Sequence, residues 1–270
     1  PSYNESFQFH IFGGLNVAAL ERSINEIIRR HEALRTIFPT IDGLAVQQIV
    51  PTLAINISVV DLQGLEEVEI QQLVTKEVQQ PFDLAISPLL RATLLRQEVE
   101  SHLLILTMHH IIMDGWSIKI FLQELSDIYQ AFSTGSPTPL PELTIQYGDF
   151  VLWQREWFTE EVQQKQLDYW KQQLADAPPL LELPTDYPRP SVQTISSAVK
   201  EWKLNSNLTA QLKTLSQQSR TTLFVTLLAS FSVLLHRYSG QDDISIGSPF
   251  ANRNRTEIQP LIGFFINTLV

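Results

Sequence analysis

The sequence contains no cysteine among its 270 residues. A disulfide scaffold, a thiolate nucleophile and a zinc site ligated by cysteine are therefore excluded. The absence of thiols fits a reducing compartment, and we expect a cytoplasmic protein.

Positive charge is also scarce, with 19 Lys and Arg residues against 29 Asp and Glu residues, and the net charge is −10. An acidic chain of this kind argues against a nucleic-acid partner and against binding to an anionic membrane. The longest apolar run, Leu223–Leu235, is too short to cross a bilayer and suits a buried helix. The N-terminus has neither a basic leader nor a long apolar segment, so no signal peptide is predicted.

The chain has enough hydrophobic residues, 44%, to build a substantial core. Its first half alternates between strand and helix patterns. We predict strands at residues 7–12, 55–61, 89–97 and 102–110, a hairpin around Asp42-Gly43, and helices at residues 17–30, capped by Asn16, 65–79 and 118–132. This order predicts a mixed α/β fold.

The second half is predicted to be helical at residues 147–173, 208–218 and 222–238, with strands at residues 197–204 and 243–249. The proline-rich stretch 177–190 is the best candidate for a linker. We therefore predict a lobe at residues 1–176, the linker, and the beginning of a second lobe at residues 191–270. Because the chain starts with proline and ends within a strand pattern, we expect both ends to be truncated.

The stretch "MHHIIMDGWS", Met108 to Ser117, carries the most chemistry. It ends a strand that is apolar on both faces, which is typical of a central, buried strand. Neighbouring side chains of a strand point to opposite faces, so only one of His109 and His110 can face a given cleft. The strand ends at His110 and a helix begins after Gly115, and such junctions commonly bind ligands in α/β folds.

From these residues alone, several interpretations stay open. A neutral imidazole beside a helix N-terminus could move a proton near pH 7, as an acid/base or acyl-transfer site requires. Both histidines could instead be structural, and Asp114 could cap the helix. A metal site at His110 and Asp114 lacks a nearby third ligand, so we predict no metal.

Five stretches in order resemble motifs of the condensation domains of nonribosomal peptide synthetases. "MHHIIMDGWS" is similar to their HHxxxDG signature, whose HHxxxD part is shared with other acyltransferases that resemble chloramphenicol acetyltransferase. The others are "RHEALRTIF" (residues 30–38), "PFDLAISPLLRATLLR" (residues 81–96), "YGDFVLWQ" (residues 147–154) and "IGSPFANRNRTEIQPLIGFFINTLV" (residues 246–270).

The resemblance implies a V-shaped pseudo-dimer of two acetyltransferase-like lobes, with the site in a tunnel between them. In this family an acceptor aminoacyl amine attacks a donor aminoacyl or peptidyl thioester and forms a peptide bond. Phosphopantetheine arms of upstream and downstream carrier proteins bring both substrates, and an adenylation domain belongs to the same assembly line. The domain itself is expected to bind no cofactor.

The resemblance also implies roles for individual residues. His110 is expected to contact the attacking amine, as a general base or by orienting it, whereas His109 is expected to be structural. Asp114 is expected to pair with an arginine, for which Arg30 and Arg35 are the candidates.

Three further residues are expected to lie close to the substrates. Gly115, which has no Cβ, is expected to let the backbone approach the reacting carbonyl, with its N–H beside the oxyanion. Arg253 matches a motif arginine near the tunnel, and Trp116 lies next to the signature.

Other functions compete with peptide-bond formation. An epimerisation domain of the same fold would use the histidine pair to move an α-proton, but the "DGWS" and "ANRNR" stretches favour condensation. A cyclisation domain would carry aspartates in place of both histidines, which this chain does not. A non-catalytic docking module and a free acyltransferase acting on CoA esters are the remaining alternatives.

Overall fold

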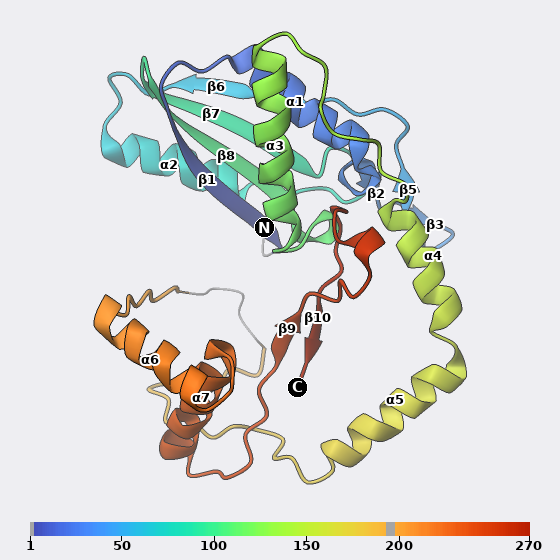
Figure 1. Ribbon diagram of the computed structural model, residues 1–270, viewed down its shortest axis with the longest axis vertical. Helices are drawn as coiled ribbons and strands as arrows, with labels where there is room; N and C mark the ends of the chain where they lie inside the picture. The colour runs from blue at the N-terminus through green and yellow to red at the C-terminus, as the bar shows by residue number, and fades with distance from the viewer. Residues whose placement is uncertain (1–2, 193–197) are drawn as a thin grey trace. The chain divides into compact units, whose positions relative to one another are not determined.

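The computed structural model describes residues 3–192 and 198–270 (Figure 1). By its internal contacts the chain forms two compact units. Unit 1 is formed by the chain up to Thr159 together with Pro249–Leu269, and unit 2 by Glu160–Ser248 with Val270. The predicted lobes meet at residues 177–190, inside unit 2, and remain a prediction. The HHxxxDG signature lies in unit 1.

Unit 1 is built on a four-stranded sheet in the order β1-β8-β7-β6. Its strands are β1 (Asn4–Phe12), β6 (Ser58–Asp61), β7 (Leu90–Glu98) and β8 (Ser101–His109). β8 pairs antiparallel with both β1 and β7, whereas β6 runs parallel to β7. The central place of β8 confirms the prediction from its apolar faces.

Helices cover both faces of this sheet (Figure 1). α1 (Val17–Arg30) and α3 (Ser117–Ser133) pack on one face, where Leu104, Leu106 and Met108 of β8 join the main core. α2 (Glu67–Gln79) packs on the other, where Leu103 and Ile105 contribute to a smaller cluster. The alternation of a β-strand therefore decides which core each side chain joins.

Two local predictions are confirmed in detail. The side chain of Asn16 accepts a hydrogen bond from the backbone N–H of Ala19 and caps α1. Asp42 and Gly43 both have positive φ, 51° and 79°, and join β3 (Thr40–Ile41) to β4 (Leu44–Ala45). Positive φ at both central residues is the geometry of the tight hairpin turn that Asp-Gly favours.

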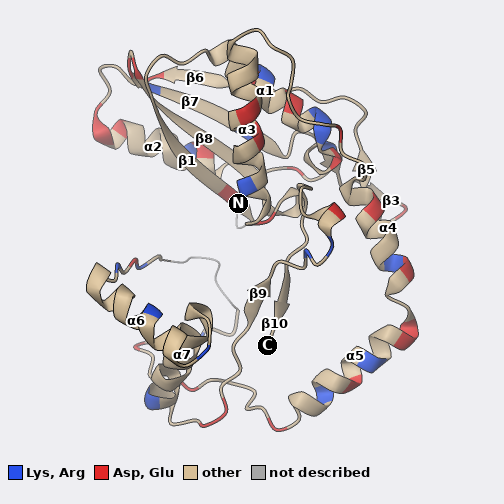
Figure 2. Ribbon diagram, viewed as in Figure 1, with Lys and Arg blue, Asp and Glu red and all other residues tan. Residues whose placement is uncertain are grey.

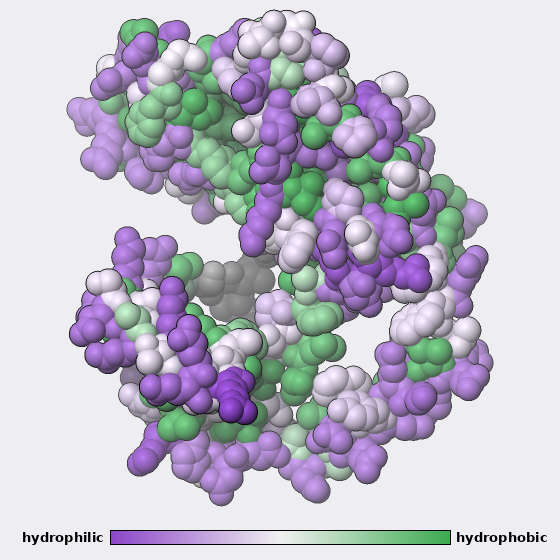
Figure 3. All heavy atoms as spheres, viewed as in Figure 1, coloured by the Kyte–Doolittle hydropathy of each residue, from purple (hydrophilic) through white to green (hydrophobic). Residues whose placement is uncertain are grey.

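Further elements belong to unit 1, except that the first residue of β9 is assigned to unit 2. They are the 3₁₀ helix η1 (Glu32–Arg35), the paired strands β2 (Thr36–Ile37) and β5 (Gln48–Ile49), α4 (Tyr147–Trp157), η3 (Thr256–Ile258), and the paired strands β9 (Ser248–Phe250) and β10 (Asn267–Leu269). A third apolar cluster joins Phe150 of α4 to Ile258, Leu261 and Phe265. This cluster holds the late segment of the chain against the first half. Hydrophobic residues also lie at the surface along β9 and β10 (Figure 3).

Unit 2 contains α5 (Glu160–Gln173), α6 (Ser206–Gln218) and α7 (Leu223–Ser239). Acidic and basic residues are interspersed along α5 (Figure 2). The predicted strand at residues 197–204 is wrong over 198–204, which form no strand, and Ser197 lies outside the described residues. The strand predicted at 243–249 begins only at Ser248.

Within the described part of the chain, no single helix has the length and apolar character of a membrane span. Only α6 and α7 together reach that length and apolar character, and they are bent by 103° relative to each other.

We predict that Phe121→Ala lowers the free energy of unfolding by about 3–5 kcal/mol. The ring of Phe121 fills the core between α3 and the sheet, and its removal leaves a cavity. Phe121 is 1% exposed. The matched control is Phe12→Ala, at a position 77% exposed, with an expected change within about 0.5 kcal/mol. Urea denaturation of both variants measures the difference, and equal losses would contradict the assignment of the core.

Candidate active site around the HHxxxDG motif

The signature lies where β8 leaves the sheet. β8 ends at His109, one residue earlier than predicted, and His110–Ile112 form the 3₁₀ helix η2 before α3 begins at Ser117. The backbone N–H of His110 still donates to the carbonyl of Tyr3, at 2.8 Å. The backbone at His110 is thereby held at the edge of the sheet while its ring leaves the strand pattern.

The imidazole of His110 is oriented by its own turn. Nδ1 lies 2.7 Å from the carbonyl oxygen of Met113, which can only accept a hydrogen bond, so Nδ1 carries the proton. Nε2 then has a free lone pair in the neutral ring, and no hydrogen bond to it occurs among the described residues. The ring of Phe264 packs against this imidazole, with ring centroids 5.0 Å apart and planes at 88°.

His109 has the opposite tautomer. Its Nδ1 accepts a hydrogen bond from the backbone N–H of Ile111, at 3.1 Å, so the neutral ring carries its proton on Nε2. The ring lies near Tyr3 and Phe82. Burial, and then the neighbouring His110, lower the pKa of His109, which favours its neutral form. Nδ1 of His109 is thus used within the turn, and the structural role expected for this residue stays a prediction.

Asp114 forms a buried ion pair with Arg253. Oδ1 of Asp114 lies 3.2 Å from a guanidinium nitrogen, and both side chains are 1% exposed. Oδ1 also accepts from the N–H and the hydroxyl of Ser117, and Oδ2 accepts from the N–H of Phe265. The predicted pairing with an arginine is therefore present. The N-cap residue of α3 is Trp116, so Asp114 is not the cap itself, although it accepts from the N–H of the first helical residue, Ser117.

The predicted pairing of Asp114 with Arg30 or Arg35 is wrong. Arg30 pairs with Glu124, and Arg35 pairs with Glu32 three residues before it. Both arginines therefore already have carboxylate partners next to α1. The stretch around Asp114 instead faces the late segment of the chain, which supplies Arg253.

The guanidinium of Arg253 is buried, and the place of this residue near a tunnel stays a prediction. Its guanidinium donates to the carbonyls of Ile258 and Leu261, at 2.8 and 2.7 Å, and lies over the ring of Phe265. Burial lowers the pKa of Arg253, and the charge of Asp114 opposes this effect. These contacts make Arg253 the arginine that holds the fold together at this point.

The segment Ile262–Phe265 is fastened along its backbone by side chains from four elements or loops. Besides Asp114, Ser117 Oγ accepts from the N–H of Gly263, and the Tyr147 hydroxyl donates to the carbonyl of Phe264. His31 Nδ1 accepts from the N–H of Ile262.

Glycine is required at position 263. A Cβ there would lie 2.3 Å from the ring of Tyr147, and that ring is fixed by its hydroxyl. Burial raises the pKa of Tyr147 to about 12, so its hydroxyl stays protonated and able to donate at neutral pH.

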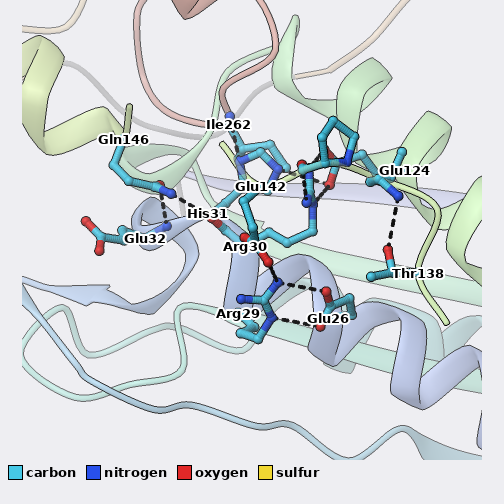
Figure 4. A network of polar contacts seen from close by, with 12 residues as sticks. Glu26, Arg29, Arg30, His31, Glu32, Glu124, Thr138, Glu142, Gln146 and Ile262 are labelled. Carbon is cyan, nitrogen blue, oxygen red and sulfur yellow. Dashed lines mark hydrogen bonds and ion pairs between the residues drawn. The ribbon is translucent and has the colours of Figure 1, made fainter. Parts of the chain in front are cut away.

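A second buried network, which the sequence did not reveal, lies behind this segment (Figure 4). Glu124 of α3 accepts from two nitrogens of Arg30, both at 3.2 Å, and from Nε2 of His31, at 3.0 Å. Arg30 also donates to the carbonyl of Pro141. Since the other nitrogen of His31 reaches Ile262, this network connects α1, α3 and the fastened segment. In the sequence, this network could have been suspected from Glu124, because a carboxylate within the apolar stripe of a helix needs a partner when it is buried.

Gly115 and Trp116 are both exposed, between the motif and α3. The position of a Cβ at Gly115 meets nothing within 4 Å, so neither packing nor positive φ requires a glycine there. Among the described residues no hydrogen bond to the Gly115 N–H occurs. Trp116 is 43% exposed, with Lys119 near its ring.

The described residues contain no group of three or more His, Asp or Glu side chains that could hold a metal ion. His110 and Asp114 do not form a pair of metal ligands, because both carboxylate oxygens of Asp114 already accept hydrogen bonds from Arg253, Ser117 and Phe265.

Comparisons with known proteins agree on one family. The model of the condensation domain matches residues 1–270. A polypeptide of the linear gramicidin synthase from Brevibacillus parabrevis is 50% identical over 99% of this chain, and the chain spans 5% of that protein. Malpinin synthetase from Mortierella alpina is 43% identical over 99% of this chain, which spans 4% of that protein.

Solved structures give the same result. A complex of the X-domain and OxyB from teicoplanin biosynthesis matches with a TM-score of 0.85 and 25% identity, over 98% of this chain and 59% of that one. A four-domain nonribosomal peptide synthetase bound to AMP and glycine matches with a TM-score of 0.83 and 26% identity, over 99% of this chain and 20% of that one.

We predict that Asp114→Ala lowers the free energy of unfolding by about 3–5 kcal/mol, because it leaves the Arg253 charge buried without its partner. In a double-mutant cycle, Asp114→Ala and Arg253→Met together should cost clearly less than the sum of the two single changes. Arg91→Met is the control, because Arg91 pairs with Glu77 and shares no partner with Asp114, so its cost should add to that of Asp114→Ala within about 0.5 kcal/mol. Normal stability of Asp114→Ala with lost activity would instead indicate a direct chemical role.

The Glu124 network predicts a dependence of stability on pH. Burial alone raises the pKa of Glu124, but hydrogen bonds from His31 and Arg30 outweigh it, so the pKa is lowered. A folded-state pKa below the unfolded value of about 4.3 adds stability above that pH, and this stability is lost as the pH falls further.

The measurement compares wild type with Glu124→Gln by urea denaturation between pH 7 and pH 3. The stability difference between them should be largest near neutral pH and should shrink below about pH 4.3. Asp127→Asn, on the same helix, controls for the loss of one negative charge. A constant difference across this range would contradict the lowered pKa.

Proposed function

Since this chain belongs to the condensation-domain family, we propose that it catalyses amide-bond formation between two thioester-bound substrates. The donor is an aminoacyl or peptidyl thioester, and the acceptor is the amine of a second aminoacyl thioester. The relatives are much longer proteins, and their names are those of peptide synthases and synthetases. That setting supports carrier proteins and an adenylation domain as partners of this chain.

The observation that carries the proposal is the free Nε2 lone pair of His110. Nδ1 is committed to the carbonyl of Met113, which leaves Nε2 as the acceptor that an incoming amine can meet. A general base must come within about 2.6–3.2 Å of the proton it takes. The packing of Phe264 and the bond to Met113 hold the ring in one orientation, so little ordering is needed at the moment of reaction.

The proposed step forms one bond and breaks one. The acceptor nitrogen attacks the donor carbonyl carbon, and the proton it loses goes to Nε2 of His110 or is held by a hydrogen bond to it. The carbonyl oxygen becomes negative, and the unpaired N–H of the exposed Gly115 is the donor we assign to it. The C–S bond then breaks, and the departing thiolate takes up the proton that the amine lost and leaves as a thiol.

The substrates in this proposal arrive on phosphopantetheine arms of carrier proteins, so the domain needs no cofactor of its own. A phosphopantetheine thioester supplies the activated carbonyl. The residues of this chain orient the amine and stabilise charge. The buried pair of Asp114 and Arg253 takes no part in proton transfer and acts by holding Phe264 and the motif in place.

A docking module is the second candidate, because a structure with this fold was solved as a complex of an X-domain with another protein, OxyB. Against it stands the unblocked Nε2 of His110, which a module that only docks would not need. An epimerisation domain would differ from both candidates in its product. It would invert the configuration of its substrate and form no new amide bond.

We predict that His110→Asn lowers the rate of amide formation about 10²–10⁴-fold, because the variant has no basic nitrogen in place of Nε2. His109→Asn is the matched control. An asparagine oxygen can accept from the N–H of Ile111 as Nδ1 does, so activity should stay within a few-fold of wild type.

The assay uses the full-length protein with both carriers loaded, and detects the amide product by mass spectrometry. Thermal melting checks that both variants fold. Full activity of His110→Asn would remove His110 from the reaction. Wild-type protein that binds its partners and forms no amide would favour the docking module.

A further inference from the structure

Phe264 is an exposed aromatic residue whose place against His110 is fixed by its neighbours. Its side chain is 39% exposed, whereas the adjacent Phe265 is 2% exposed and packs with Tyr147, Phe150 and Arg253. The backbone at Phe264 is held by the Tyr147 hydroxyl, and the next N–H by Asp114. The ring therefore cannot be displaced by moving the segment as a whole.

The ring is close enough to His110 to border the space that the side chain of an acceptor would take. An amine that bonds to Nε2 of His110 lies about 2.6–3.2 Å from it. Two more covalent bonds, each about 1.5 Å, place the first side-chain carbon of the acceptor within about 6 Å of Nε2. The Phe264 ring centroid is 5.0 Å from the His110 ring centroid, so the ring lies within a similar distance of the imidazole as that carbon.

We propose that Phe264 is a specificity-determining residue that limits the bulk of the acceptor amino acid at its β-carbon. This inference rests on the proposed function, because it takes His110 Nε2 as the position of the acceptor amine. Glycine and alanine leave room beside the ring. Branched and aromatic acceptors have to displace a ring that is braced on one side by the imidazole.

The test compares acceptors of different size on the acceptor carrier of the full-length protein. Glycyl, alanyl, valyl and phenylalanyl thioesters are offered with one constant donor, and kcat and KM are measured for each. Phe264→Ala should raise the ratio of kcat/KM for valyl over glycyl acceptor about tenfold or more, the scale on which pockets discriminate small apolar groups. Phe264→Leu should give a smaller rise, and Phe264→Trp a fall.

The control is Phe12→Ala, since Phe12 lies at the opposite end of β1 from the motif and should leave the ratio unchanged. A uniform fall in kcat for all acceptors would overturn the proposal, because it would mean that Phe264 only orients His110. An unchanged ratio in the Ala, Leu and Trp variants would overturn it as well. Wild-type protein that forms amide with none of the acceptors would overturn the proposed function, and this inference with it.

Discussion

The buried pair of Asp114 and Arg253 is the constraint on which the arrangement of the site depends. It joins two positions 139 residues apart, and both side chains are almost fully enclosed. Removing two charges from water is costly, and such a pair is tolerated only when hydrogen bonds satisfy the remaining atoms. Here Ser117, Phe265, Ile258 and Leu261 do so, although Nε of Arg253 has no partner among the described residues. The pair therefore fastens the late segment to the motif more by geometry than by net stabilisation.

The two neighbouring histidines differ in tautomer because the backbone turns between them. The two rings carry the same atoms, but a backbone N–H faces Nδ1 of His109 and a backbone carbonyl faces Nδ1 of His110. Opposite tautomers follow, because an N–H can only donate and a carbonyl can only accept. In His110 this leaves the lone pair of Nε2 without a hydrogen-bond partner among the described residues, while in His109 the lone pair of Nδ1 is used within the turn. The end of β8 at His109, one residue before the expected position, is what gives the two rings different surroundings.

The sequence predicted the elements around the site well and its ion pairs poorly. Periodicity placed β7, β8, α1 and α3 within a few residues, because each buries a regular apolar face. No such pattern reports which arginine meets Asp114, since the answer depends on how a late loop folds back onto the first half of the chain. Of the two candidates, Arg35 meets Glu32, and Arg30 meets Glu124, a carboxylate within the apolar stripe of α3. A charge at a buried helical position indicated a partner without identifying it.

The exposure of Phe264 follows from the same packing that makes the site rigid. Burial alternates along this segment, with Gly263 and Phe265 inside and Phe264 outside. Phe265 is drawn inward by Phe150 and by the guanidinium of Arg253, and Gly263 must lie under the ring of Tyr147. The side chain of Phe264, between them, therefore points away from this core and packs against His110. An aromatic side chain next to His110 is thus a consequence of how the core is closed. The backbone bonds that fix its position involve no atom of its side chain, so they place no demand on the type of residue at position 264.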